Sequence, residues 1–203
     1  MKNSILALLA IAAIVACKKN ETTAVDRNTD STQMATPVDS TRKTSDSATM
    51  SNTANVANSL SDQDKKFADA AARGGLMEVM MGQLAATNAS NAKVKALGEM
   101  MVKDHSKAND ELKKWASAIG YTLPTGLDAE KQKEYDDLKA KKEAEFDRSY
   151  TDLMVSDHKK DIEEFKKEAA EGKETSLKSF ASGTLPTLQH HLMESEKAKA
   201  AIK

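Results

Sequence analysis

The feature that most constrains the fold is the stretch 61–203, which has the composition of helices throughout. Ala, Leu, Met, Lys and Glu dominate it, strand signals are absent, and proline occurs in it only twice. Straight-chain residues and alanine lose little rotamer freedom in a helix, so they favour that conformation over long stretches. The stretch therefore predicts an all-α domain.

Capping and turn residues divide this domain into segments. Ser61 or Asp62 can cap a first helix, an Asn-Ala-Ser-Asn turn follows it, and Gly120 ends the second helix. Pro186 predicts a kink or a break in the last helix, near Thr184. We expect helices at about 61–88, 91–120, 128–138, 145–172 and 174–201. Two helical hairpins joined by a short crossover helix make an up-down four-helix bundle.

The first sixteen residues predict an export signal. The segment MKNS carries one positive charge, and the apolar run ILALLAIAAIVA after it is shorter than the about 20 residues of a membrane-crossing helix. The run ends at Cys17 and resembles the lipobox of bacterial lipoprotein signal peptides, which are cleaved before an acylated cysteine. We expect residues 1–16 to be removed and lipidated Cys17 to anchor the protein; the alternative is a stray thiol. Lys18 favours the outer membrane, facing the periplasm.

Residues 17–60 predict a disordered tether between the anchor and the domain. They are rich in Ser, Thr, Asn and Asp and cannot bury enough apolar surface to offset the entropy of ordering. An alternative is a segment that folds on a partner.

The net charge of the whole chain is −1, and acidic and basic residues are interleaved along it, so the sequence gives no basic face for nucleic acid. Protein partners are not identified by the sequence, which is compatible with a homo-oligomer.

A repeated stretch places histidines in two of the predicted helices. Residues 101–116, MVKDHSKANDELKKWA, and 154–169, MVSDHKKDIEEFKKEA, align His105 with His158. At helical spacing both histidines lie on apolar stripes. The stripes contain Met101, Leu112 and Trp115 in the first copy and Met154, Ile162 and Phe165 in the second.

The other two long helices offer one inward polar residue each. Glu78 lies in an otherwise apolar or small row, and His191 faces the core whereas His190 turns away. Glu78 and His105 are nearly symmetric about the turn between their helices, and so are His158 and His191. Each pair is therefore level within about one helical turn. We expect four helices to contribute one polar side chain each.

Two interpretations of these four residues stay open. Three imidazoles and one carboxylate suit a single Zn, Cu, Ni or Fe ion if they converge. Alternatively, each imidazole is hydrogen-bonded to Glu78, Tyr150 or a backbone carbonyl in a satisfied core network. Asp104 and Asp157 point about 100° away from the adjacent histidines. We expect these two to pair across helices, cap exposed faces or meet lysines.

The motifs GGLMEV, MVKDH, EFDRSY, MVSDH and TLPTLQHHL occur in this order between residues 64 and 201. They resemble the DUF4142 family of exported bacterial proteins, a domain of unknown function with the description "predicted outer membrane protein". The resemblance implies a ferritin-like four-helix bundle and no established activity. Its recurrent polar positions correspond to Glu78, Asp104, His105, Asp147, Asp157, His158 and His191. We expect Asp104, Asp147, Tyr150 and Asp157 to form a core polar network.

The chain departs from the ferritin-like di-iron pattern. Such proteins use Glu-x-x-His on two helices, but the residues three before the inward histidines are Val102, Val155 and Leu188. The sequence also lacks a P-loop, a nucleophile elbow and a dinucleotide-binding turn, and no catalytic residue is predicted. We therefore expect an envelope lipoprotein that serves as a binding or stress-protection module. The alternatives are a metal-storage protein or redox enzyme with a mononuclear site, and a purely structural envelope protein.

Overall fold

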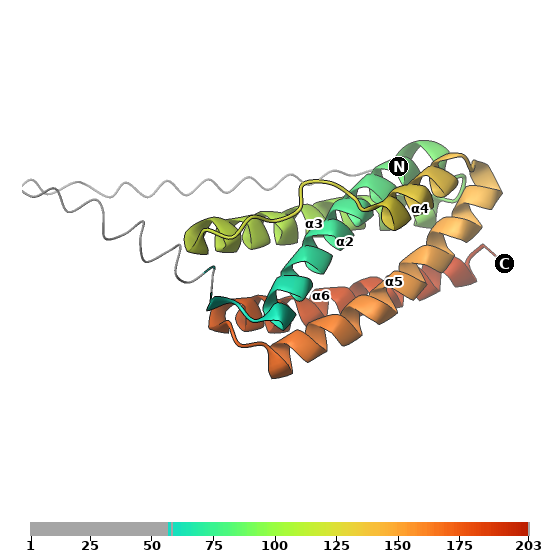
Figure 1. The fold of residues 1–203 in the computed structure, drawn as a ribbon. Helices are drawn as coiled ribbons and strands as arrows, with labels where there is room; N and C mark the ends of the chain where they lie inside the picture. The colour runs from blue at the N-terminus through green and yellow to red at the C-terminus, as the bar shows by residue number, and fades with distance from the viewer. Residues whose placement is uncertain (1–56, 58, 203) are drawn as a thin grey trace, which may run out of the picture. The chain divides into compact units, whose positions relative to one another are not determined.

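The computed structural model describes residue 57 and residues 59–202, and helices are the regular elements of that part (Figure 1). The predicted signal peptide 1–16, Cys17 and nearly all of the tether 17–60 lie outside the described residues. No helix in the described part of the chain is long and apolar enough to cross a membrane. The helices are α2 (Asp62–Asn88), α3 (Ala92–Ile119), α4 (Ala129–Lys139), α5 (Glu143–Glu171) and α6 (Thr175–Ala200). The prediction of an all-α four-helix bundle with a short crossover helix is confirmed.

The bundle consists of two hairpins, α2 with α3 and α5 with α6, and α4 packs against α2 and α5. Asp147, in the first turns of α5, accepts hydrogen bonds from the backbone N–H groups of Ser90 at 3.1 Å and Asn91 at 3.0 Å. Since these residues precede α3, α3 and α5 begin at the same end of the bundle and run parallel. The crossover 120–142 returns the chain to that end, so the two copies of the repeated stretch have the same direction.

Most helix starts follow the predicted caps. The Ser61 hydroxyl accepts from the backbone N–H of Asp64, whose carboxylate accepts in return from the backbone N–H of Ser61. The side chains of Asn91 and Asp128 accept from backbone N–H groups in the first turns of α3 and α4. Gly120 ends α3 with a φ of 73°, a backbone conformation that glycine adopts without steric penalty.

Of the kink or break predicted at Pro186, the break does not occur, because helix α6 continues through Pro186 from Thr175 to Ala200. Proline removes one backbone donor from the helical ladder. Two residues before Pro186, the hydroxyl of Thr184 donates to the carbonyl oxygen of Phe180 at 2.8 Å. The helix thus stays intact over the turns that carry His191.

The buried core forms two apolar clusters along the bundle axis. The cluster nearer the α2–α3 turn contains Met77, Met81, Ala85, Val94, Leu97, Met101, Leu138, Phe146, Tyr150, Met154 and Ala198. The other contains Leu60, Phe67, Ala68, Leu112, Trp115, Ile162, Phe165, Leu177, Ala181 and Leu188. Leu60, the last residue of the predicted tether, is buried in the second cluster. The boundary between the clusters coincides with the predicted polar residues on all four long helices.

Candidate metal centre

Four buried polar side chains, one from each long helix, lie in the layer between the two apolar clusters. Glu78 comes from α2, His105 from α3, His158 from α5 and His191 from α6. Their exposed fractions are 4%, 6%, 0% and 1%, respectively. The helical spacing of the sequence directs them inward, and the parallel course of α3 and α5 brings both predicted pairs to one level. His190 is exposed, as its spacing predicts.

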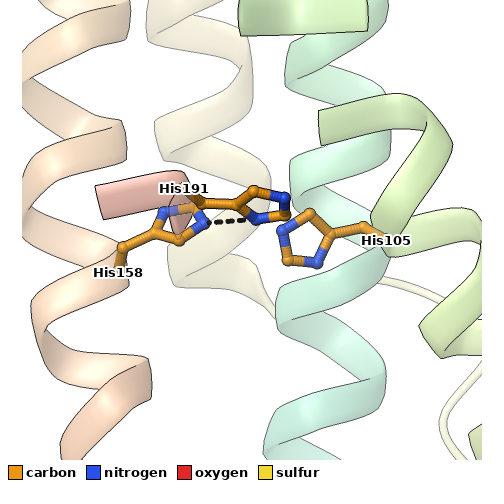
Figure 2. A group of neighbouring side chains, drawn as sticks. All are labelled: His105, His158 and His191. Carbon is orange, nitrogen blue, oxygen red and sulfur yellow. Dashed lines mark hydrogen bonds between the residues drawn. The ribbon is translucent and has the colours of Figure 1, made fainter. Parts of the chain in front are cut away.

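The three imidazole rings converge on one point (Figure 2). One nitrogen of each ring lies within 4.8 Å of the corresponding nitrogens of the other two. Nε2 of His158 is 3.2 Å from Nδ1 of His191 and 3.5 Å from Oε1 of Glu78. The structure therefore gathers all four candidate ligands in one group.

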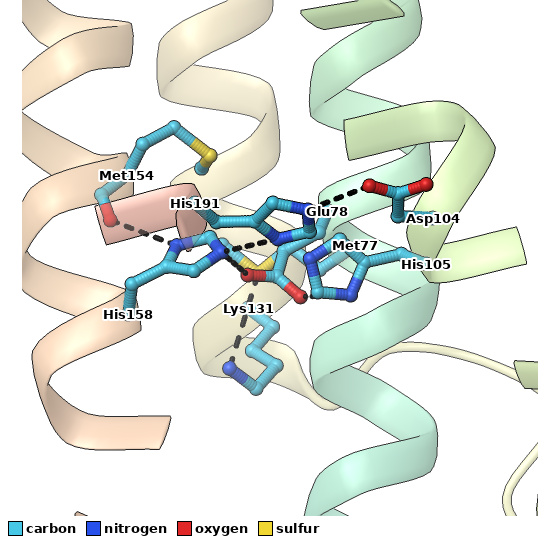
Figure 3. Close-up of polar contacts among 8 residues, drawn as sticks. All are labelled: Met77, Glu78, Asp104, His105, Lys131, Met154, His158 and His191. Atoms are coloured by element: carbon cyan, nitrogen blue, oxygen red, sulfur yellow. Dashed lines mark hydrogen bonds and ion pairs between the residues drawn. The ribbon is translucent and has the colours of Figure 1, made fainter. Parts of the chain in front are cut away.

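Each imidazole directs its outer nitrogen to an acceptor (Figure 3). Nδ1 of His158 lies 2.9 Å from the backbone carbonyl oxygen of Met154 in the preceding turn. Nε2 of His191 lies 3.0 Å from Oδ2 of Asp104 on α3. Nδ1 of His105 lies 2.9 Å from Oε2 of Glu78. Because a carbonyl oxygen or a carboxylate only accepts, each outer nitrogen is the donor.

The inner nitrogens are consequently the ones with lone pairs in the neutral rings. They are Nε2 of His105, Nε2 of His158 and Nδ1 of His191. Nε2 of His105 and Oε1 of Glu78 are buried without a hydrogen-bond partner among the described residues. The lone pairs of His158 and His191 face each other at 3.2 Å, an arrangement that is repulsive unless a proton or a cation lies between them.

Burial and mutual charge set the protonation of this layer. Burial lowers the pKa of His158 and takes that of His191 to about 4, so both are neutral at neutral pH. Burial also acts against the charged form of His105, but the Glu78 carboxylate outweighs it and raises the pKa of His105. Burial acts to raise the pKa of Glu78, yet the histidines, His105 foremost, bring it to about 2. Without a metal ion the layer therefore holds a Glu78–His105 ion pair beside two neutral imidazoles.

The donor set fits a single transition-metal ion. Imidazole nitrogen and carboxylate oxygen ligate Zn, Cu, Ni and Fe, and metal-bound histidines ordinarily donate their other N–H to a carboxylate or a carbonyl. His158 and His191 have such an acceptor outside the ligand set, whereas the acceptor of His105 is Glu78, itself a candidate ligand. Ligands about 2.0–2.1 Å from one ion lie at most about 4 Å apart, so the longest separation, 4.8 Å, must shorten by about 1 Å. Binding would also release the extra proton of His105.

The two aspartates of the repeated stretch have different environments. Asp104 pairs across helices with His191, as expected of it, and its side chain is 28% exposed. Asp157 is half-buried, and no hydrogen bond or ion pair to it occurs within 59–202. Burial, with the nearby carboxylates Glu134 and Glu78, raises the pKa of Asp157 to about 7. The repeat is therefore symmetric in its histidines and asymmetric in its aspartates.

The other two residues of the predicted polar network lie apart from the histidines. Asp147 holds the α2–α3 turn through Ser90 and Asn91. Tyr150 is fully buried and stacks on Phe146, and its hydroxyl has no partner among the described residues. Tyr150 therefore does not hydrogen-bond an imidazole, contrary to one of the alternatives considered for the network.

Sequence reasoning missed three buried or half-buried acids. Asp64 and Glu168 are buried near the opposite end of the bundle, where Asp64 also accepts from the backbone N–H of Lys173 at 2.8 Å. Asp161 lines a small cavity next to Glu78 and His105. Asp161 aligns with Ala108 in the repeated stretch, and that break in the alignment is the signal that could have identified it.

Two solved structures share this architecture. The crystal structure of a DUF305 fragment from Deinococcus radiodurans superposes with a TM-score of 0.62 and 10% identity over 70% of this chain and 98% of that one. CopM in its Cu(II)-bound form superposes with a TM-score of 0.59 and 14% identity over 69% and 97% of the two chains. These likenesses show the fold.

The sequence itself identifies a family. Comparison with curated proteins gives no match. The family described as "Domain of unknown function (DUF4142)" matches residues 49–198, which include all four residues of the buried layer. The expected resemblance is therefore confirmed, and the chain belongs to the DUF4142 family.

Proposed function

We propose that this protein binds one transition-metal ion in the core of its bundle, with Glu78, His105, His158 and His191 as ligands. The observation that carries the proposal is the orientation of the histidines: each directs one N–H to an acceptor and turns its other nitrogen toward the shared centre, where His158 and His191 present lone pairs. A purely structural network would pair its inner atoms. Here Nε2 of His105 and Oε1 of Glu78 have no hydrogen-bond partner among the described residues.

Copper(II) is the first candidate ion. A site of neutral imidazoles and one carboxylate binds Cu(II) more tightly than the other divalent first-row ions. The structural neighbour CopM is known in a Cu(II)-bound form, which supports testing copper before zinc, nickel or iron. The protein would hold the ion in a closed site, a role in metal binding or storage rather than in turnover.

The setting we propose is the cell envelope. Export by residues 1–16 and acylation of Cys17 would place the bundle on a membrane, on the periplasmic side of the outer membrane. Residues 17–60 would act as a linker that lets the bundle extend away from the lipid surface. A metal-binding module there would meet ions as they enter the envelope, which is also consistent with a stress-protection role.

Metal analysis of the purified protein tests the function. We expect one equivalent of Cu(II) per chain after loading and desalting, and loss of retained copper in His158→Ala and His191→Ala. The matched control is His190→Ala, which removes an exposed imidazole from the same helix. Failure of the wild-type protein to retain copper, zinc, nickel or iron would refute the proposal, and so would full retention by both core variants.

A further inference from the structure

The buried layer needs a route for the ion, because none of its four residues is more than 6% exposed. A cavity of 30 Å³ adjoins Glu78 and His105 and is also lined by Gly74 of α2 and by Asp161 and Glu164 of α5. The two unpartnered atoms of the layer, Oε1 of Glu78 and Nε2 of His105, belong to residues of its wall. The cavity has room for at least one water molecule.

A larger hollow between α2 and α5 adjoins this cavity. A hollow of 340 Å³ shares Ala70 and Glu164 with the cavity. Asp161 and Glu164 are both half-buried, so carboxylates line the path from the hollow to Glu78. Burial and the surrounding carboxylates, Glu78 foremost, raise the pKa of Asp161 against the opposing effect of Lys131, so Asp161 holds its proton until a cation displaces it.

Gly74 leaves this path open. It lies one helical turn before Glu78 on the same face of α2, and a Cβ added to it would meet nothing within 4 Å. Glycine inside a helix costs about 1 kcal/mol relative to alanine. Gly74 therefore keeps this space open beside the candidate ligands, although alanine would favour the helix more.

A second hollow, of 270 Å³ between α3 and α6, shares Ala108, Phe180 and Thr184 with the cavity. None of these shared residues is charged. The carboxylate in this hollow nearest the layer, Asp104, is engaged by His191. Lys66 and Lys167 also line the α2–α5 hollow, but the residues that join this hollow to the cavity include the carboxylate of Glu164, whereas those that join the α3–α6 hollow to it include none.

We propose that a divalent transition-metal cation reaches the buried layer through the α2–α5 cavity, where Glu164 attracts it and Asp161 releases its proton to bind it briefly and pass it to Glu78. This inference rests on the proposed function. Carboxylates along a narrow, partly desolvated path raise the local cation concentration and the association rate. Asp161 is thus an entry residue rather than a ligand of the final site.

Stopped-flow absorbance with Cu(II) on the purified full chain tests the route. Asp161→Asn should slow association at low salt by about tenfold, within the range of electrostatic steering, and should leave stoichiometry and equilibrium affinity unchanged. Gly74→Leu, which fills the cavity, should slow both association and dissociation. The matched controls are Glu163→Gln, an exposed acid on α5, and Gly183→Leu, which fills the α3–α6 hollow; both should bind at the wild-type rate.

The outcomes separate this proposal from the proposed function. If the wild-type protein binds no metal, both fail. If it binds copper and Asp161→Asn associates at the wild-type rate, the route is wrong while the site stands. Weaker equilibrium affinity at an unchanged association rate would make Asp161 a ligand and overturn the entry role, and slower binding in Gly183→Leu alone would assign entry to the α3–α6 side. Since Asp161→Asn only neutralises one half-buried acid, the test holds even if Gly74→Leu fails to fold.

Discussion

Replacing Glu168 by glutamine should stabilise the protein above neutral pH. The Glu168 side chain is buried at the α2–α5 seam, where Oε2 accepts from Nε2 of Gln63 at 3.2 Å and Oε1 has no hydrogen-bond partner among the described residues. Burial, together with the neighbouring carboxylate of Asp64, raises the pKa of Glu168 to about 7. Ionising Glu168 therefore works against the folded state.

The sign and size of this effect follow from proton linkage. Between the ordinary glutamate pKa and about 7, folded Glu168 holds a proton that the unfolded chain has lost, so its contribution to stability decreases as pH rises. A shift of about 2.5 pKa units corresponds to about 3 kcal/mol at about 1.4 kcal/mol per unit. Nearby solvent screens part of this electrostatic penalty, so we expect Glu168→Gln to raise the free energy of unfolding by about 1–3 kcal/mol above pH 7. Glutamine does not ionise, so Glu168→Gln should match the wild type near pH 5 and exceed it near pH 8.

Urea denaturation followed by circular dichroism at both pH values measures the difference. The histidine layer titrates identically in both proteins and cancels in the comparison. Glu163→Gln, on the exposed face of α5, is the control and should change stability equally at the two pH values. Stability curves of wild type and Glu168→Gln that stay parallel from pH 5 to pH 8 would refute the reasoning.

Three further predictions concern the site and its scaffold. Asp104→Ala should weaken copper affinity by about 10–100-fold, because it removes the acceptor that orients His191; the equivalent Asp157→Ala should leave affinity in calorimetry nearly unchanged. Gly98→Ala should lower the free energy of unfolding by about 1–3 kcal/mol, since its Cβ would lie 2.5 Å from Ala85 Cβ and 2.7 Å from Gly82 O. Gly183→Ala, with nothing within 4 Å, should raise it by about 0.4–1 kcal/mol in the same urea titrations. Copper at 100 times its dissociation constant should stabilise the wild type by about 2.7 kcal/mol, seen as a raised melting temperature, and should not stabilise His191→Ala.

Local rules predicted much of the fold. Ser61, Asn91 and Asp128 cap helices as expected, because capping depends on a few neighbouring residues. The inward direction of His105 and His158 follows from helical spacing, which is also a local property. The level that the two hairpins share depends on the length and course of the crossover, and no residue pattern specifies that.

The partners of the polar side chains were less predictable. Asp104 and Asp157 occupy equivalent positions in the repeated stretch, yet only Asp104 meets a histidine, because α6 lies beside it. Asp64 and Glu168 stand among charged residues in the sequence, as exposed acids usually do. They are buried because the ends of α2, α5 and α6 come together around them. Contacts across helices depend on rotamers and helix rotation, and spacing within one helix does not encode them.

Pulsed electron paramagnetic resonance of the Cu(II)-loaded protein tests the central claim most directly, because it counts the imidazoles bound to the ion. The proposed site predicts three coordinated imidazoles per copper in the wild type and two in any copper retained by His191→Ala, with His190→Ala unchanged. Copper bound at full occupancy with no imidazole signal, or with a signal that His105→Ala, His158→Ala and His191→Ala all leave intact, would contradict the claim that these four helices hold one ion.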